Sequence, residues 1–162
     1  MPKSEKIALV TGANKGIGFE VARRLAAKGF RVFVGARNEK AGHAAVRKIG
    51  PAATFLKLDV SDHASIREAV AELAKMVDHL DVLVNNAGII VDGDDAILKA
   101  TPDQFETTMR TNTLRPLMVA QAFSPCSRTH RHRGSSMFQA VADNCTTAPT
   151  AGRQFIAFQK RR

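Results

Sequence analysis

A glycine-rich run near the start of the chain has the residue types and spacing of a phosphate-binding loop. Residues 11–18 read TGANKGIG, and they lie between an apolar stretch and a stretch with helical periodicity. Glycine allows a tight turn and lets a phosphate approach the backbone closely, while the free N–H groups at the start of a helix attract anions. The alternative is an ordinary glycine-rich turn between a strand and a helix, which the loop alone does not exclude.

Further polar residues follow later apolar stretches. Asp59 and Val60 come after a third apolar run, the segment 85–88 (NNAG) comes after a fourth, and Asn112 lies in the sequence RTNTLRP. The carboxyl ends of parallel strands meet at one edge of a sheet, where ligands bind in folds of this kind. Whether these residues can form one site therefore depends on the strands and helices that position them.

Strand-like and helix-like segments alternate through residues 6–123. The predicted strands are 6–11, 31–35, 54–58 and 81–85, and the predicted helices are 16–28, 39–49, 62–79, one that opens at Thr101-Pro102, and the stretch 116–123. Gly29 is placed to cap the first helix at its carboxyl end, and Ser61 or Asp62 to cap the third at its amino end. This alternation predicts an α/β fold, a parallel sheet covered by helices on both faces.

Four features in the right order make residues 6–123 resemble the short-chain dehydrogenase/reductase family. They are TGANKGIG at 11–18, the turn Leu58-Asp59-Val60, the run 85–88 and Asn112. The loop has three residues between its first two glycines, unlike the GxGxxG pattern, and GANKGIG followed by GARN looks like the carbonyl reductase branch. The resemblance implies the first four strands of a Rossmann-like, doubly wound sheet in the order 3-2-1-4, with the fourth strand at an edge.

The resemblance also implies roles for individual residues. The glycines would shape the phosphate loop, Ile17 would pack beneath the cofactor, Asp59 would accept from the adenine amino group, and Val60 would contact the adenine ring through its backbone. Asn112 matches the family's catalytic asparagine, which holds a water in the proton relay. The full predicted cofactor-binding set is Gly12, Asn14, Lys15, Gly16, Ile17, Gly18, Arg37, Asn38, Asp59, Val60, Asn86, Ala87 and Gly88.

The charge after the second predicted strand indicates which dinucleotide is preferred. Sites that prefer NAD place an acid there to accept from the ribose 2′-hydroxyl, whereas residues 35–38 read GARN, with no acid. Arg37 is available for a 2′-phosphate, and Lys15 adds a second positive charge. We therefore expect NADPH to be favoured over NADH, against the alternative that both residues are solvated surface cations.

The chain contains no tyrosine and no tryptophan. The family's active site resembles a Ser–Tyr–Lys set in which the tyrosine exchanges a proton with the substrate carbonyl, so a Tyr-x-x-x-Lys motif cannot exist here. The sequence therefore predicts an NADP(H)-dependent, carbonyl reductase-like oxidoreductase by descent that is inactive as this chain. The alternatives are a dinucleotide-binding module without catalysis and a basic-tailed interaction protein.

Residues 124–162 differ from the rest and read as an aberrant, disordered basic tail. They hold seven basic residues against one acid, Asp143, which accounts for +6 of the net charge of +9. With each codon's third base read together with the next two bases, residues 133–140 can encode Arg-Ile-Val-Asn-Val-Ser-Ser and residues 153–160 can encode Pro-Val-Tyr-Arg-Val-Ser-Lys. We infer a frameshift near Pro125. A zinc site formed by Cys126, His130, His132 and Cys145 fits no common spacing.

The composition bounds the remaining possibilities. The chain has 162 residues, 44% of them hydrophobic, which suits one globular domain. Two cysteines exclude a disulfide-rich secreted scaffold, no apolar run reaches ~20 residues, and the amino terminus lacks a signal-peptide pattern. We expect a cytoplasmic protein whose partners are a dinucleotide and, in the intact family, a small carbonyl substrate, without a specific nucleic acid or a membrane. The oligomeric state stays open.

Overall fold

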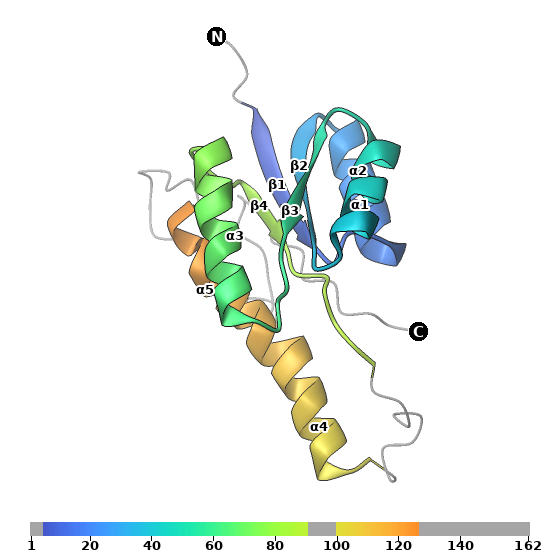
Figure 1. Ribbon diagram of the computed structural model, residues 1–162, viewed down its shortest axis with the longest axis vertical. Coiled ribbons are helices and arrows are strands. Elements are labelled where there is room, and N and C mark those ends of the chain that lie inside the picture. Colours follow the sequence, from blue (N-terminus) through green and yellow to red (C-terminus); the bar gives the residue numbers. More distant parts are fainter. Residues whose placement is uncertain (1–4, 91–99, 127–162) are drawn as a thin grey trace, which may run out of the picture.

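The computed structural model describes residues 5–90 and 100–126 (Figure 1). Nearly all of the predicted basic tail, the two stretches that carry the frameshift hypothesis, and three of the four imagined zinc ligands lie outside the described residues. These expectations remain predictions, and the description below concerns the described ranges.

Four parallel strands form one sheet. They are β1 (Lys6–Thr11), β2 (Phe30–Ala36), β3 (Ala53–Lys57) and β4 (Val82–Val84), and their spatial order is β3-β2-β1-β4. The central strand β1 pairs with β2 along its whole length and with β4 over three residues. The predicted order 3-2-1-4 is confirmed. The order reverses beside β1, which makes the carboxyl ends of β1 and β4 the place where ligands bind in such sheets.

Helices cover both faces of the sheet, as Figure 1 shows. On one face lie α1 (Gly16–Ala27) and α2 (Glu39–Ile49), packed against Val10 and Val34. On the other lie α3 (His63–Met76) and α5 (Arg115–Phe123), packed against Leu9 and Phe33. Successive strand residues point to opposite faces, so a buried strand supplies both cores with apolar side chains. The predicted three-layer α/β fold is confirmed.

Most helix ends follow local sequence signals. The Asn38 side chain accepts from the backbone N–H of Ala41 at the start of α2, and the Asp62 side chain accepts from two N–H groups at the start of α3. Asp62 is thus the cap of α3. Helix α4 (Pro102–Met109) opens with a capping box between Thr101 and Gln104. The cap that follows α1 at Gly29 has φ of +82°, a conformation that favours glycine.

The helix predicted for residues 62–79 is too long. It ends at Met76, and Val77 is already extended, with φ of −150°. The reason is tertiary, because the chain must turn here to enter the sheet. The N–H of Leu80 donates to the carbonyl of Cys126, and the N–H of Asp81 donates to that of Ile7. Strand bounds also differ from the predicted ones by one residue at several ends.

A π-helical turn, Arg110–Leu114, joins α4 to α5 and was not expected from the sequence. Pro116 lies two residues beyond it and has no N–H to donate to a carbonyl four residues earlier, which disfavours regular α-helical bonding across this junction. Beyond α5, residues Ser124–Cys126 form a 3₁₀ turn. Figure 1 shows α4 projecting away from the sheet, and no residue of α4 is buried within the described part of the chain.

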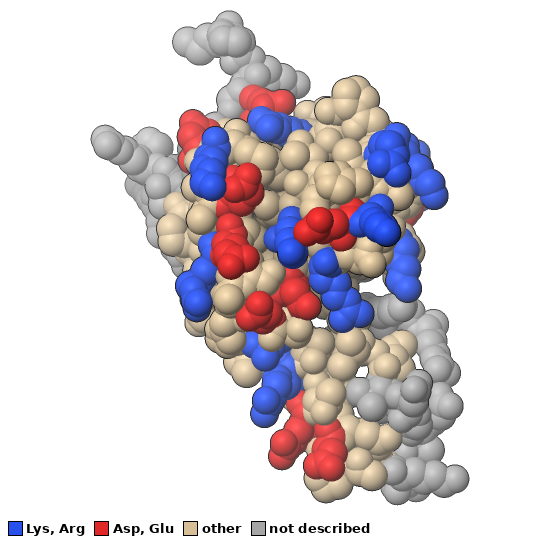
Figure 2. All heavy atoms as spheres, in the orientation of Figure 1, with Lys and Arg blue, Asp and Glu red and all other residues tan. Residues whose placement is uncertain are grey.

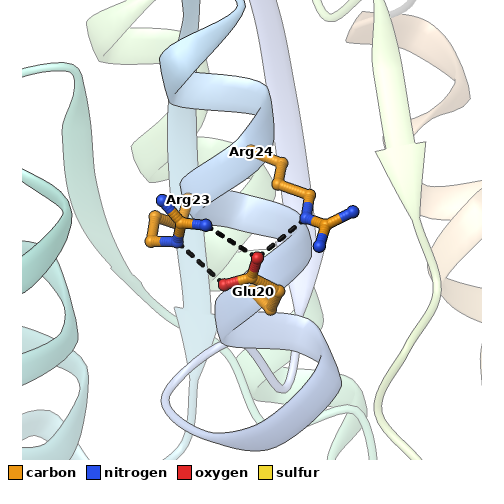
Figure 3. Close-up of polar contacts among 3 residues, drawn as sticks. All are labelled: Glu20, Arg23 and Arg24. Carbon is orange, nitrogen blue, oxygen red and sulfur yellow. Dashed lines mark hydrogen bonds and ion pairs between the residues drawn. The ribbon is translucent and has the colours of Figure 1, made fainter.

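The described surface carries charges of both signs. Figure 2 shows acidic and basic side chains interspersed on one face, and several are paired, as in Lys57–Glu39 at 3.1 Å. On α1 the Glu20 carboxylate accepts from Arg23 and Arg24 (Figure 3). These hydrogen bonds, first that of Arg23 and then that of Arg24, lower the pKa of Glu20 from 4.5 to about 2. None of the described helices is long and apolar enough to cross a membrane.

Candidate functional site

A cleft of about 780 Å³ lies at the carboxyl ends of the strands. Every strand contributes, because the loop that follows each of them reaches the cleft, and the junction between α4 and α5 closes another side. The lining residues are Gly12, Asn14, Lys15, Gly16, Ile17, Gly18, Ala36, Arg37, Leu58, Asp59, Val60, Ser61, Asn85, Asn86, Ala87, Gly88, Ile89, Ile90, Thr111, Asn112 and Pro116. The structure thus brings together all the predicted site residues except Asn38.

The loop between β1 and α1 presents its backbone to this cleft. Gly12 and Gly16 have φ of +65° and +61°, the left-handed region that favours glycine. Helix α1 begins at Gly16, and the residue before it, Lys15, gives the helix no side-chain cap. The N–H groups of the first turn, with the positive end of the helix dipole, are therefore placed to bind an anion.

Gly18 lets the loop lie close to its neighbours. A Cβ atom at this position would be 2.7 Å from the carbonyl oxygen of Gly12 and would also collide with the Asn86 side chain. A Cβ at Gly12 would lie 3.1 Å from the Cα of Ala87. These contacts explain why the loop needs small residues, and they show that it is packed directly against the segment that follows β4.

The Thr11 hydroxyl joins that segment to the loop. It accepts from the backbone N–H groups of Asn86 and Ala87, each at 3.0 Å. The Asn86 side chain in turn donates to the carbonyls of Thr11, at 2.9 Å, and Gly12, at 3.3 Å. Asn86 therefore holds the glycine loop in shape.

Asn112 lies in the π turn and forms hydrogen bonds to Ile89, in the segment that follows β4. Its Oδ1 accepts from the N–H of Ile89 at 2.9 Å, and its Nδ2 donates to the carbonyl of Ile89 at 2.8 Å. A Cβ on Gly88 would lie 3.1 Å from Asn112 Oδ1, so the glycine leaves room for the pair. Asn112, which was predicted as a proton-relay residue, thus connects the π turn between α4 and α5 to the segment that follows β4.

Asp59 is a half-buried carboxylate in the loop that follows β3, and it lines the cleft. Burial raises its pKa, but two hydrogen bonds from Ser61 and the positive charges of Arg37 and Arg115 outweigh burial, so the pKa lies below its usual 3.8. The backbone N–H of Asp59 donates to Ser65 Oγ at 2.9 Å. The carboxylate is thus ionised at neutral pH.

Arg37 and Lys15 are the cations that line the cleft. Within residues 5–90 and 100–126 neither forms an ion pair, which leaves both charges for a ligand. Asn38 instead caps α2 through its side-chain oxygen, and it is absent from the cleft lining. Ile17, which also lines the cleft, is 46% exposed.

Sequence reasoning missed some residues of the site. The role of Thr11 could have been suspected, because a threonine ends the first strand immediately before the glycine loop. Ser61 was considered only as a helix cap, although a serine two residues after an aspartate is a common turn signal. Four more missed residues lie near recognised ones in the chain, and nothing in their own types indicated a place in the cleft. They are Ile89, Ile90, Thr111 and Pro116.

The chain is similar in sequence to known proteins. Residues 6–138 match the profile of the short chain dehydrogenase family. A short chain dehydrogenase/reductase of Gibberella zeae is 38% identical over 130 residues, which cover 75% of this chain and 36% of the relative. The NADPH carbonyl reductase 1 of Mus musculus is 45% identical over 118 residues, covering 69% of this chain and 41% of the relative.

A solved structure agrees with the sequence comparison. The crystal structure of a variant of actinorhodin polyketide ketoreductase with NADPH superposes with a TM-score of 0.65 and 35% identity, covering 74% of this chain and 46% of that one. The chain therefore spans less than half the length of each of these three proteins. The matched profile extends past Phe123 into the segment predicted to be aberrant.

Proposed function

The chain belongs to the short chain dehydrogenase family, and we propose that its cleft binds NADPH in preference to NADH, in the manner of a carbonyl reductase. The observation that carries this proposal is the pairing of an uncapped helix start at Gly16 with two unpaired cations, Lys15 and Arg37, around one cleft. The mouse relative of similar sequence is named for NADPH, which supports the same preference.

The described residues fit a dinucleotide. Glycine at positions 12 and 18 avoids collisions with the segment 86–87 and within the loop, and in this loop shape the first turn of α1 offers N–H groups to a pyrophosphate. Asp59 can accept from an adenine amino group, and we propose that Asn86 and Ala87, which line the same cleft, contact the adenine ribose. A bound ring system would shield the exposed side chain of Ile17 from solvent.

Arg37 and Lys15 set the preference between the two nicotinamide cofactors. A guanidinium matches the geometry of a phosphate and forms charge-assisted hydrogen bonds, whereas a 2′-hydroxyl would prefer an acid that residues 35–38 do not supply. Arg37 also lies close enough to Asp59 to affect its pKa, so the two side chains belong to one end of the cleft.

The family reaction exchanges a hydride between the nicotinamide and a carbonyl carbon, and that chemistry is supplied by the cofactor when it is bound. This chain's part in it is to hold the dinucleotide and to position Asn112. No tyrosine exists in the 162 residues to donate a proton to the carbonyl oxygen, and both polar atoms of the Asn112 side chain are bonded to Ile89. We propose that this chain by itself reduces no carbonyl compound.

Titration with NADPH and NADH tests the binding proposal. The unmodified chain should bind NADPH more tightly, and Arg37→Ala should remove most of the difference, because a hydrogen bond to a charged group contributes about 1.5–3 kcal/mol. Arg47→Ala on the outer surface of α2 serves as the matched control and should leave both affinities unchanged. Equal affinity for the two cofactors in the unmodified chain would contradict the assignment.

An NADPH-binding chain without turnover is a dinucleotide-binding module without catalysis, and the missing tyrosine favours this function over that of an active carbonyl reductase. A turnover assay on small aldehydes and ketones with saturating NADPH separates the two. Loss of a general acid removes a factor of about 10²–10⁴ in rate, so we expect no activity above background. Robust turnover would show that a different proton donor operates. A cytoplasmic location and a small carbonyl substrate for the intact family belong to the same proposal.

A further inference from the structure

Ser61 makes two hydrogen bonds to a single oxygen of the Asp59 carboxylate. Its backbone N–H donates to Oδ1 at 2.8 Å, and its hydroxyl donates to the same Oδ1 at 2.6 Å. The backbone bond is that of an ordinary turn initiated by aspartate, which any residue at position 61 could complete. The hydroxyl bond is additional. It requires serine or threonine, and it is short, as charge-assisted bonds between oxygens are.

These bonds engage Oδ1 and leave the second carboxylate oxygen, Oδ2, to accept a hydrogen bond from a ligand. Oδ2 of Asp59 has no hydrogen-bond partner within the described residues, and no buried side-chain oxygen there lacks a partner, so Oδ2 retains contact with solvent. Both Asp59 and Ser61 line the cleft. An Asp59 side chain whose Oδ1 is fixed from one side cannot exchange its two oxygens freely by rotation, and Oδ2 is the atom left to face a ligand.

We propose that Ser61 is a positioning residue for nucleobase recognition, which holds the Asp59 carboxylate so that Oδ2 accepts from an exocyclic amino group of the bound base. The proposal rests on the proposed function, because it requires a dinucleotide in the cleft. The contact between Asp59 and the amino group of the base belongs to the proposed function. The inference adds that a hydroxyl two residues beyond this carboxylate orients it for that contact.

The surroundings of the carboxylate are consistent with this role. The backbone of Asp59 is anchored separately by Ser65 in α3, so the main chain is fixed before the side chain is oriented. Arg37 and Arg115 bring positive charge to the same carboxylate, which keeps it in the acceptor form. An ionised, oriented carboxylate favours a donor and repels a carbonyl oxygen in the same place.

The test compares NADPH with its hypoxanthine analogue, in which a carbonyl oxygen replaces the amino group. The unmodified chain should prefer NADPH by about tenfold or more, the contribution of a hydrogen bond to a charged group. Ser61→Ala should reduce that ratio by about two- to tenfold, the range of one ordinary hydrogen bond. Ser61→Thr retains a hydroxyl and should keep the ratio.

Two further measurements separate positioning from a structural effect. In a chain that already carries Asp59→Ala, adding Ser61→Ala should change the ratio no further, because the group it positions is gone. The carboxyl signal of Asp59, followed by NMR against pH without cofactor, should titrate at higher pH in Ser61→Ala and near its original position in Ser61→Thr. Circular dichroism checks that each variant is folded.

The possible failures are distinguishable. If the unmodified chain binds neither nucleotide, the proposed function is wrong and the role of Ser61 falls with it. If NADPH binds but Ser61→Ala discriminates as the unmodified chain does, or its Asp59 titration does not move, only the positioning role is overturned. A ratio that falls equally with and without Asp59 would likewise overturn it.

Discussion

The cleft is bounded by two walls, one formed by the glycine loop between β1 and α1 and the other by the π turn between α4 and α5. On the first wall the polar groups are left for a ligand, because α1 has no side-chain cap and Lys15 forms no ion pair in the described chain. On the second wall the main polar side chain, Asn112, is bonded through both its atoms to Ile89.

This difference bears on the proposed function, in which the first wall holds the cofactor. The first wall is fixed to its neighbours by the Thr11 and Asn86 network. The second wall, as far as the chain is described, offers an asparagine that orients a loop but no acid that could deliver a proton. Under the proposed function, dinucleotide binding and proton transfer therefore depend on different segments, so a chain can have one without the other.

Gly18→Ala should disrupt the first wall most. The new Cβ would meet the Gly12 carbonyl, a backbone atom that cannot rotate away, so the cost is expected at the upper end of overpacking, about 3 kcal/mol. NADPH binding should be lost as the loop is displaced. Calorimetry and denaturant unfolding measure the two effects.

The control for this change is Gly16→Asn. A Cβ at Gly16 would meet no heavy atom within 4 Å, and asparagine tolerates the left-handed conformation of this position better than most residues. The variant should remain folded with a smaller loss of stability. If Gly18→Ala binds NADPH as the unmodified chain does, the close packing of the loop is not needed for binding.

Thr11→Val should weaken the link between the first wall and the segment after β4. Valine has nearly the same shape, but it leaves the N–H groups of Asn86 and Ala87 without their acceptor. Each unsatisfied donor costs about 1–3 kcal/mol when buried, and these are partly buried, so we expect about 2 kcal/mol in urea unfolding. Thr113→Val, at an exposed hydroxyl, should change stability by less than about 0.5 kcal/mol. Equal effects at both sites would contradict the network.

Asn112→Ala should loosen the second wall with a smaller effect on the first. It removes two hydrogen bonds in an exposed setting, for which we expect about 1 kcal/mol of stability. The amide of Ile89 should exchange faster with deuterated solvent, while NADPH affinity should fall less than in Gly18→Ala. A loss of affinity as large as that of Gly18→Ala would show that the two walls do not act separately.

Glu20→Gln, on the outer face of α1, should have the smallest effect, a small loss of stability above pH 4.5 that disappears in acid. The Arg23 and Arg24 bonds lower the folded-state pKa of Glu20 from 4.5 to about 2, so its ionised form stabilises the fold above pH 4.5. That contribution is lost as the pH falls from 4.5 to about 2. The variant should therefore have a flatter dependence of thermal stability on pH in this window and unchanged NADPH binding. An unchanged slope would mean that the bonds in Figure 3 contribute nothing in solution.

The sequence predicted the first wall better than the second for a physical reason. Helix caps and the glycine loop depend on local patterns, and the capping residues Thr101 and Asp62 are confirmed. The strand order, also confirmed, was implied by the family resemblance. The bonds from Thr11 to Asn86 join residues far apart in the chain, and no local pattern encodes them. The early end of α3 at Met76 likewise depends on contacts with Ile7 and Cys126. The π turn lies where Pro116 cannot donate a helical hydrogen bond. The hydrophobic periodicity does not show whether the helix continues, kinks or forms a π turn at such a position.

The π turn also bears on how this segment can vary in length. An α-helix turns by about 100° per residue, so one residue more or less within 110–114 would rotate α5 against α4 by roughly that angle. Val119 and Phe123, which are fully buried, would then be turned away from the core, while α4 has no buried residue to hold it in a particular phase. The junction is therefore expected to tolerate no insertion or deletion, although a substitution within it such as Asn112→Ala is expected to cost only about 1 kcal/mol.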